Sequence, residues 1–347
     1  MKKHAHVLAL SLTIPLAAFV ILCPLVTNGQ SPITLVATGS SLPEPLYLLW
    51  ADEYHKLHRQ IQLRYLPEGT SESASHILSG EGDFGGGDAP IPKKDLKGSA
   101  HPVVELPAVL IGIVVVYNVP GGEAALRLSG TVLANIFLGK TKNWNDPEIV
   151  KLNPDLKLPN LAIAVVHRTE GKGSSYIFSD FLSKVSPEFQ AKVGRSVSPN
   201  WPVGASYGRT EDLLNSVRST SGAIGYTELN WAEKYALPVA EIRNTAGEFV
   251  KPSVKSIAEA ASTLESEMTE DFRVSLTNAR GKESYPISSF TWLYVPTAAG
   301  DAQRGRAVAE YLQWVYSDGQ EIAKSQGYAT LPASLLTKVK AKAATIR

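Results

Sequence analysis

Three segments of the chain carry the residue types of an anion-binding site: 38–43, 67–73 and 167–175. Each joins an expected strand to an expected helix and is rich in glycine and hydroxyl side chains. In the first, Ser41 suits a helix cap and Pro43 suits the opening turn. Free backbone N–H groups at such a helix start, together with a hydroxyl, can bind an anion. Many helices begin this way and bind nothing, so a single loop leaves both interpretations open.

The segment 167–175 is the most specific of the three. Arg168 offers a planar fork of donors that matches a tetrahedral oxyanion, and two glycines let the backbone approach a ligand closely. Ser174 or Ser175 is expected to cap the helix that follows. The segment lacks the earlier glycine of a nucleotide-binding P-loop. The alternative interpretation is a flexible surface turn with a solvated arginine.

Asp88, which follows the glycine-rich run 83–87, is the unexpected residue in this group. A carboxylate repels an anion unless the anion carries a proton. Phosphate carries at least one proton at neutral pH, whereas sulfate carries none. An aspartate acceptor would therefore favour phosphate and leave sulfate with an unrelieved repulsion. The alternative is an ordinary aspartate in a turn or at a helix cap.

The elements that must position these loops alternate between short apolar runs and amphipathic segments, as in an α/β protein. The runs 33–37 and 61–65 predict strands, and each is followed by apolar residues at helical spacing. Two longer apolar runs, 109–117 and 290–295, suit strands buried on both faces or passing between two domains. The chain could leave one domain in the first run and return to it in the second. The helix expected at 307–315 would then complete that domain.

Length and charge limit the classes of function. The chain has 347 residues, which predicts about two domains. Its 34 Lys and Arg balance 33 Asp and Glu, which argues against a broad basic surface for nucleic acid. Any affinity for anions must therefore come from a local site. A hydrolase is also disfavoured, because the sequence has no Gly-x-Ser-x-Gly motif and its seven His residues form no zinc-binding pattern.

The N-terminus has the layout of a secretory signal peptide, which we place at residues 1–30. Two lysines precede an uncharged apolar stretch, 7–26, and a polar segment, 27–31, follows it. An uncleaved membrane anchor is the alternative, because the stretch is nearly long enough to span a bilayer. A lipoprotein signal ending at Cys23 is disfavoured by the bulky residue before it. Cleavage would remove Cys23, the only cysteine, and so exclude disulfides and cysteine chemistry in the mature protein.

The order and spacing of several motifs are similar to those of a known family. The chain resembles the periplasmic phosphate-binding proteins of Pst-type ABC importers over nearly its whole mature length. The motifs that carry the resemblance are 37–45, 83–90, 136–140, 144–147, the Arg168 segment, 222–226 and 327–332. The resemblance implies an α/β, two-lobed periplasmic-binding-protein (Venus-flytrap) fold with a two-stranded hinge. Lobe I would comprise residues 31–111 and 290–347, and lobe II residues 112–289.

The resemblance also implies a site between the lobes that encloses phosphate on hinge closure, with neither a metal nor a cofactor. Asp88 would accept a hydrogen bond from the ligand proton, and Glu170 would lie beside Arg168. Lys172 stands where the family usually has a ligand-binding serine. It would either pair with Glu170 or point to solvent, or else contact the ligand and loosen discrimination against other oxyanions. The implied phosphate-binding residues are Ser41, Leu42, Thr70, Ser71, Asp88, Arg168, Gly173 and Ser174.

By the same resemblance, the chain is expected to be a monomeric, periplasmic solute-binding protein and not an enzyme. Its partners would be inorganic phosphate and the membrane permease of a Pst-type importer. A binding protein for arsenate, sulfate or molybdate, or a phosphate-sensing paralogue, would have a similar sequence.

Overall fold

The computed structural model describes residues 32–121, 125–297 and 300–346 of the chain. The predicted signal peptide and Cys23 lie outside the described residues. No helix in the described part of the chain is both long and apolar enough to cross a membrane.

Eight strands form one sheet: β1 (Ile33–Gly39), β2 (Ile61–Pro67), β3 (Phe84–Gly87), β4 (Val103–Asn118), β6 (Ala164–Arg168), β7 (Ala205–Tyr207), β8 (Ala223–Glu228) and β11 (Ser288–Pro296). Their order is β2-β1-β3-β11-β4-β8-β6-β7. On one side of β4 and β11, β1 pairs in parallel with β2 and β3; on the other side, β6 pairs in parallel with β7 and β8. Parallel strands alternating with helices confirm the predicted α/β class. A second, small sheet contains β5 (Arg127–Leu128), β9 (Glu241–Arg243) and β10 (Phe249–Val250).

Strand β4 belongs to both halves of the large sheet. It pairs with β11 as far as Gly112, and from Ile113 onward it pairs with β8. It is buried along almost its whole length, as the apolar run predicted. It begins earlier than the predicted 109–117, at Val103. Pro107 cannot donate a hydrogen bond to a neighbouring strand, and the sheet accommodates it where the register between β4 and β11 shifts.

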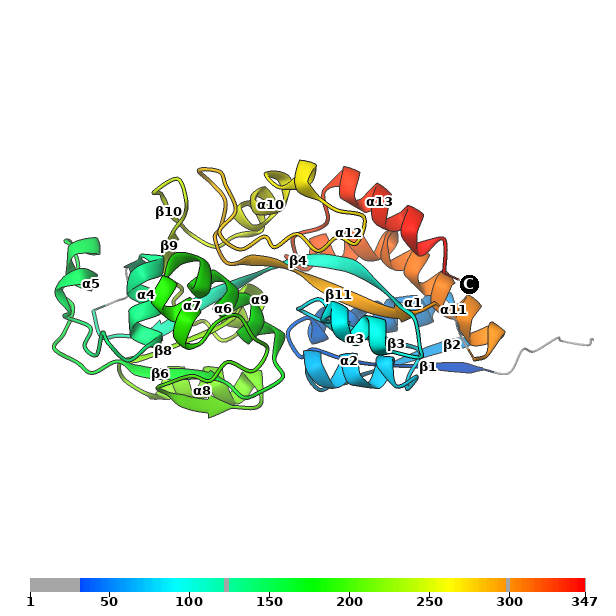
Figure 1. The fold of residues 1–347 in the computed structure, drawn as a ribbon, viewed down its shortest axis with the longest axis horizontal. Coiled ribbons are helices and arrows are strands. Elements are labelled where there is room, and N and C mark those ends of the chain that lie inside the picture. Colours follow the sequence, from blue (N-terminus) through cyan, green and yellow to red (C-terminus); the bar gives the residue numbers. More distant parts are fainter. Residues whose placement is uncertain (1–31, 122–124, 298–299, 347) are drawn as a thin grey trace, which may run out of the picture. The chain divides into compact units, whose positions relative to one another are not determined.

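Helices cover the strands on both sides of β4 and β11 (Figure 1). The helices α1, α2 and α11 pack against β1–β3, whereas α6 and α8 pack against β6 and β8. The bounds are α1 (Glu44–Leu57), α2 (Thr70–Leu78), α3 (Lys93–Gly98), α4 (Gly130–Phe137), α5 (Pro147–Leu152), α6 (Gly173–Val185), α7 (Pro187–Lys192), α8 (Thr210–Ser219), α9 (Leu229–Lys234), α10 (Val254–Ser262), α11 (Ala302–Val315), α12 (Asp318–Ser325) and α13 (Ala333–Ala343), with a 3-10 turn at Glu265–Glu267.

Aromatic side chains fill the two ends of the sheet separately. At one end Tyr54 packs edge-on against Tyr311 and Trp314, which joins α1 to α11. At the other end Phe178 stacks on Tyr226, with ring centroids 4.4 Å apart. Each end of the sheet therefore has its own aromatic contacts within the buried core.

Candidate oxyanion site

The loops after β1, β2 and β6 lie together, although β6 belongs to the opposite half of the sheet from β1 and β2. A Cβ atom on Gly173, the first residue of α6, would lie 2.5 Å from Thr70 Oγ1 and 2.6 Å from Asp88 Cβ. Ser41 Oγ lies 3.4 Å from Thr210 Oγ1, at the start of α8. The three predicted loops therefore converge on one place between the two halves of the sheet, and Asp88 lies among them.

Two helices begin at this place without a side-chain cap. Helix α2 starts at Thr70 and α6 at Gly173, and in neither does a side chain accept a hydrogen bond from the first turn. The first N–H groups of a helix have no acceptor within the helix, and the helix dipole adds positive potential, so both starts can bind an anion. The expected cap at Ser174 or Ser175 is wrong, because Lys172 occupies the cap position and both serines lie in the first turn.

The loop after β1 is built around Ser40, which was not among the predicted site residues. Its Oγ accepts the N–H of Leu42 at 3.2 Å and donates to Asp88 Oδ2. The expected cap at Ser41 is wrong, because Pro43 occupies the position before α1. Two adjacent serines were the only sequence signal for Ser40, and the sequence does not tell which of the two turns inward.

Asp88 is completely buried, and its two carboxylate oxygens differ. Oδ2 accepts the hydroxyl hydrogen of Ser40, whereas Oδ1 has no hydrogen-bonding partner among the described residues. The backbone N–H of Asp88 donates to Thr70 Oγ1 at 3.2 Å. Burial raises the pKa of Asp88 to about 7, against the opposing effects of the Ser40 hydroxyl and the Arg168 charge. A ligand that brings a hydrogen-bond donor would satisfy Oδ1 and favour the ionised carboxylate.

Arg168 is 3% exposed and, among the described residues, its side chain donates to neutral acceptors. The bonds reach Thr210 Oγ1 and Gly208 O at 2.6 Å and Tyr207 O at 3.2 Å. Glu170, expected beside Arg168, makes no ion pair with it, because it lies in the exposed turn after β6. Burial lowers the pKa of Arg168. A buried guanidinium without a carboxylate in contact favours an anionic ligand.

The remaining predicted residues take different positions around this place. Ser174 is 1% exposed, and its Oγ has no hydrogen-bonding partner among the described residues. Thr70 is buried at the start of α2, whereas Ser71 is half-buried and donates its N–H to Gly171 O at 3.1 Å. Thr38, which was not predicted, also has a buried and unpartnered hydroxyl oxygen within the described chain.

Lys172 does not adopt the position that we expected for it. Its Nζ donates to Glu68 O at 2.8 Å and lies 4.0 Å from Glu72 Oε1. Only 14% of its side chain is exposed. The expectation that it pairs with Glu170 or points to solvent is therefore wrong, because the loop after β2 supplies both a carbonyl and a carboxylate within its reach.

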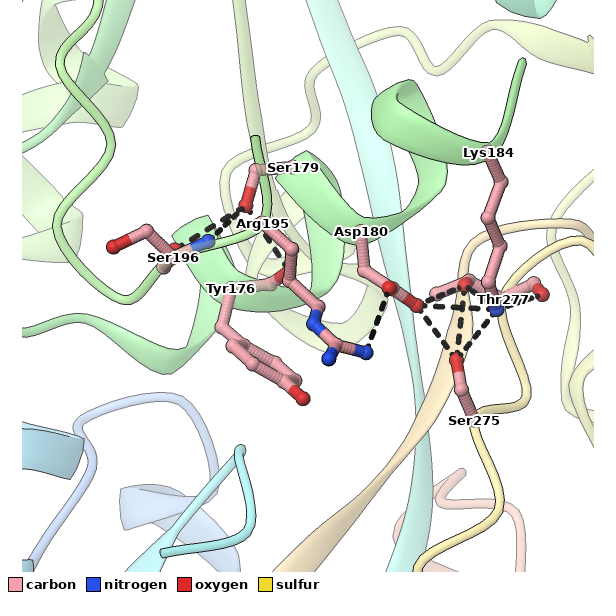
Figure 2. Close-up of polar contacts among 8 residues, drawn as sticks. All are labelled: Tyr176, Ser179, Asp180, Lys184, Arg195, Ser196, Ser275 and Thr277. Carbon is pink, nitrogen blue, oxygen red and sulfur yellow. Dashed lines mark hydrogen bonds and ion pairs between the residues drawn. The ribbon is translucent and has the colours of Figure 1, made fainter. Parts of the chain in front are cut away.

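Helix α6 is anchored away from its first turn by Asp180 (Figure 2). The Asp180 carboxylate accepts hydrogen bonds from the hydroxyls of Ser275 and Thr277. It also forms ion pairs of 3.2 Å with Lys184 and with Arg195. Burial alone would raise the pKa of Asp180, but these partners hold it below its usual value. The helix whose start faces Asp88 is thus tied to the chain segment that precedes β11.

Comparison with known proteins identifies the family of this chain. A sequence model described as the PBP superfamily domain matches residues 26–319. The phosphate-binding protein PstS of Pasteurella multocida is 35% identical over 319 residues, which cover 92% of this chain and 91% of that protein. The chain belongs to the PstS family.

Further comparisons give a second PstS relative and a solved structure with a similar fold. PstS of Haemophilus influenzae is 34% identical over 310 residues, which cover 89% of this chain and 92% of that protein. The crystal structure of a phosphate-binding protein from Stenotrophomonas maltophilia aligns with a TM-score of 0.69 at 19% identity, covering 89% of this chain and 93% of that one. This PstS-family chain therefore has the two-lobed α/β fold that its sequence predicted.

Proposed function

We propose that this chain captures inorganic phosphate between its two lobes and delivers it to the permease of a Pst-type ABC importer. The observation that carries the proposal is the combination at Asp88: a buried carboxylate with an unpartnered oxygen, lying against the uncapped start of α6. The helix start favours an anion, and the carboxylate favours a ligand that can donate a hydrogen bond. A protonated phosphate has both properties, whereas sulfate has only the first.

The binding residues of the proposal are those suggested by the sequence. Asp88 Oδ1 would accept a hydrogen bond from the protonated ligand. Arg168 would exchange one or more of its hydrogen bonds to uncharged groups for contacts with the oxyanion. Hydroxyls and N–H groups at the starts of α2 and α6 would surround the remaining oxygens. The full set is Ser41, Leu42, Thr70, Ser71, Asp88, Arg168, Gly173 and Ser174.

We assign lobe I to residues 31–111 and 290–347, and lobe II to residues 112–289. The support for this division is that β4 exchanges β11 for β8 between Gly112 and Ile113. Phosphate bound to one lobe would favour closure of the other around it, by rotation about these strands. We further propose that the mature protein acts as a monomer in the periplasm and performs no chemistry on its ligand.

The proposal is tested by calorimetric titration of the ligand-stripped protein with phosphate and with sulfate. The wild type is expected to bind phosphate tightly and sulfate weakly or not at all. The Asp88→Asn variant should bind sulfate more tightly than the wild type does, because the repulsive charge is removed and an amide donor replaces it. Sulfate binding by the wild type that equals its phosphate binding would contradict the proposal and favour a broader oxyanion-binding protein.

A further inference from the structure

The loops after β2 and β6 are joined directly to each other by contacts outside the oxyanion site. The β2 loop ends at the start of α2, on the lobe I side, and the β6 loop ends at the start of α6, on the lobe II side. Two contacts of Lys172 span them: one to Glu68 O at 2.8 Å and one to Glu72 Oε1 at 4.0 Å. A backbone hydrogen bond of 3.1 Å, from Ser71 N–H to Gly171 O, lies beside them.

The ammonium group of Lys172 is shielded from solvent and interacts with these partners. Its side chain is only 14% exposed, whereas that of Glu72 is 46% exposed. Burial lowers the pKa of Lys172, and the nearby Glu72 carboxylate acts in the opposite direction. A largely buried cation needs a hydrogen-bonding partner to offset the loss of its hydration. The Glu68 carbonyl supplies that partner at normal hydrogen-bond length.

The backbone next to these contacts leaves room for them. A Cβ atom on Gly69 would collide with the carboxylate of Glu72 and would lie 2.8 Å from Lys172 Nζ. Any larger residue at this position would push both side chains apart. The glycine before α2 thus leaves room for the side chains of Lys172 and Glu72 beside the start of the helix.

We propose that Lys172 is a closure latch: a positioning residue that holds the two loops together and slows ligand release without contacting the ligand. The inference rests on the proposed function, because it concerns the same closed site. Separation of the lobes breaks both Lys172 contacts and the Ser71 bond and returns the ammonium to water. The latch contacts therefore exist only in the closed form and act on the release rate. This role explains how a lysine can replace a ligand-binding serine without bringing a second cation to the ligand.

The test measures phosphate release by stopped-flow spectroscopy for the wild type and for Lys172→Met, Lys172→Arg and Glu72→Gln. We expect Lys172→Met to release phosphate roughly tenfold faster, the size of one hydrogen bond made by a charged group. Lys172→Arg should restore part of the loss. Glu72→Gln should have a smaller effect, since the Glu68 carbonyl remains in place. Glu170→Gln is the matched control for Glu72→Gln. It also removes one carboxylate charge, but from an exposed position in the loop that carries Lys172.

The preference for phosphate over sulfate separates a latch from a ligand contact. A latch leaves that preference unchanged in all four variants, whereas a ligand-contacting lysine changes it on substitution. Unchanged release in Lys172→Met, or an altered preference, would overturn the inference.

Failure of the latch can be distinguished from failure of the proposed function. If the wild type binds another oxyanion in place of phosphate, the function fails and the release of that oxyanion tests the latch. If it binds none, the proposed function fails, and the latch, which rests on it, fails with it. If it binds phosphate but Lys172→Met releases it at the wild-type rate, the latch alone fails.

Discussion

Asp88 combines complete burial with an incomplete set of hydrogen bonds. Its Oδ2 is satisfied by Ser40, but Oδ1 is not satisfied by any described residue. A buried carboxylate in this state is unfavourable, which is reflected in a pKa raised to about 7 by burial. Under the proposed function the same feature would make the residue selective, because a ligand that donates a hydrogen bond would satisfy Oδ1. The empty site would then be less stable than the occupied one, and the site would discriminate between oxyanions.

The raised pKa predicts that the ligand-free protein loses stability as pH rises. The folded state keeps a proton on Asp88 up to about pH 7, whereas the unfolded state loses it near the ordinary value of 3.8. The free energy of unfolding should therefore fall by about 1.4 kcal/mol per pH unit through this window. Urea denaturation of wild type and Asp88→Asn between pH 4 and pH 8 measures this slope.

The difference between the two proteins isolates Asp88 from other buried acids. Burial also raises the pKa of Glu228 to about 8, but that residue is present in both proteins and cancels. The slope should be smaller in Asp88→Asn than in the wild type. Equal slopes would show that Asp88 is ionised in the empty site.

Among the elements, α6 is constrained both at its start and at its middle. Its first residue, Gly173, lies so near Thr70 and Asp88 that a Cβ atom there would collide with both, and its middle is anchored by Asp180 to Ser275 and Thr277. The anchor fixes the helix at a distance from its first turn, and the uncapped start lies beside Thr70 and Asp88. Under the proposed function, the N–H groups of this start would face the anion. The absence of a side chain at Gly173 is what allows so close an approach.

We predict that Gly173→Ala weakens phosphate binding by roughly tenfold or more without destabilising the empty protein. The added Cβ would lie 2.5 Å from Thr70 Oγ1 and 2.6 Å from Asp88 Cβ, and overpacking of this kind is unfavourable. It disfavours the closed form only, because the lobes are apart in the open form. Calorimetry and thermal unfolding measure the two effects.

Gly98→Ala is the matched control, since a Cβ there meets no heavy atom within 4 Å. It should leave the affinity unchanged and should not lower the stability, because Gly98 ends helix α3 and alanine favours a helix more than glycine does. If Gly173→Ala lowered the unfolding temperature but not the affinity, the close approach would be a feature of folding and not of closure.

At the scale of the whole molecule, the two halves of the large sheet share β4, with β11 paired to its first part. Each half also has its own ring contacts, Tyr54 with Tyr311 in one and Phe178 with Tyr226 in the other. The binding residues of the proposal come from both halves. Binding and closure are therefore expected to be coupled, since the ligand completes its contacts only when the halves meet.

We predict that phosphate decreases the radius of gyration of the ligand-stripped protein in small-angle X-ray scattering, whereas sulfate at the same concentration does not. In Arg168→Ala the decrease should be lost together with tight binding, because the buried cation at the end of β6 is gone. Circular dichroism of this variant checks that it is folded. Full compaction of Arg168→Ala on phosphate addition would argue against a role for this arginine in closure.

Much of the fold follows from local sequence. The runs 33–37 and 61–65 became β1 and β2, because apolar residues bounded by turn residues favour buried strands. The run 109–117 became the C-terminal part of β4, whereas Pro107 made the beginning of the strand difficult to predict. The three anion loops were recognisable because hydroxyls and glycines at helix starts form a local pattern.

Contacts between distant segments were decided only by the tertiary structure. Ser40 and Asp88 are 48 residues apart, and Lys172 and Glu68 are 104 residues apart. The sequence predicted an arginine, an aspartate and three helix starts rich in glycine and hydroxyl groups as candidates for an oxyanion site. It did not predict that Ser40 donates to Asp88, or that Lys172 crosses to the opposite loop. The partners of these side chains depend on which backbone carbonyls and carboxylates lie within reach once the chain has folded. A local sequence pattern does not contain that information.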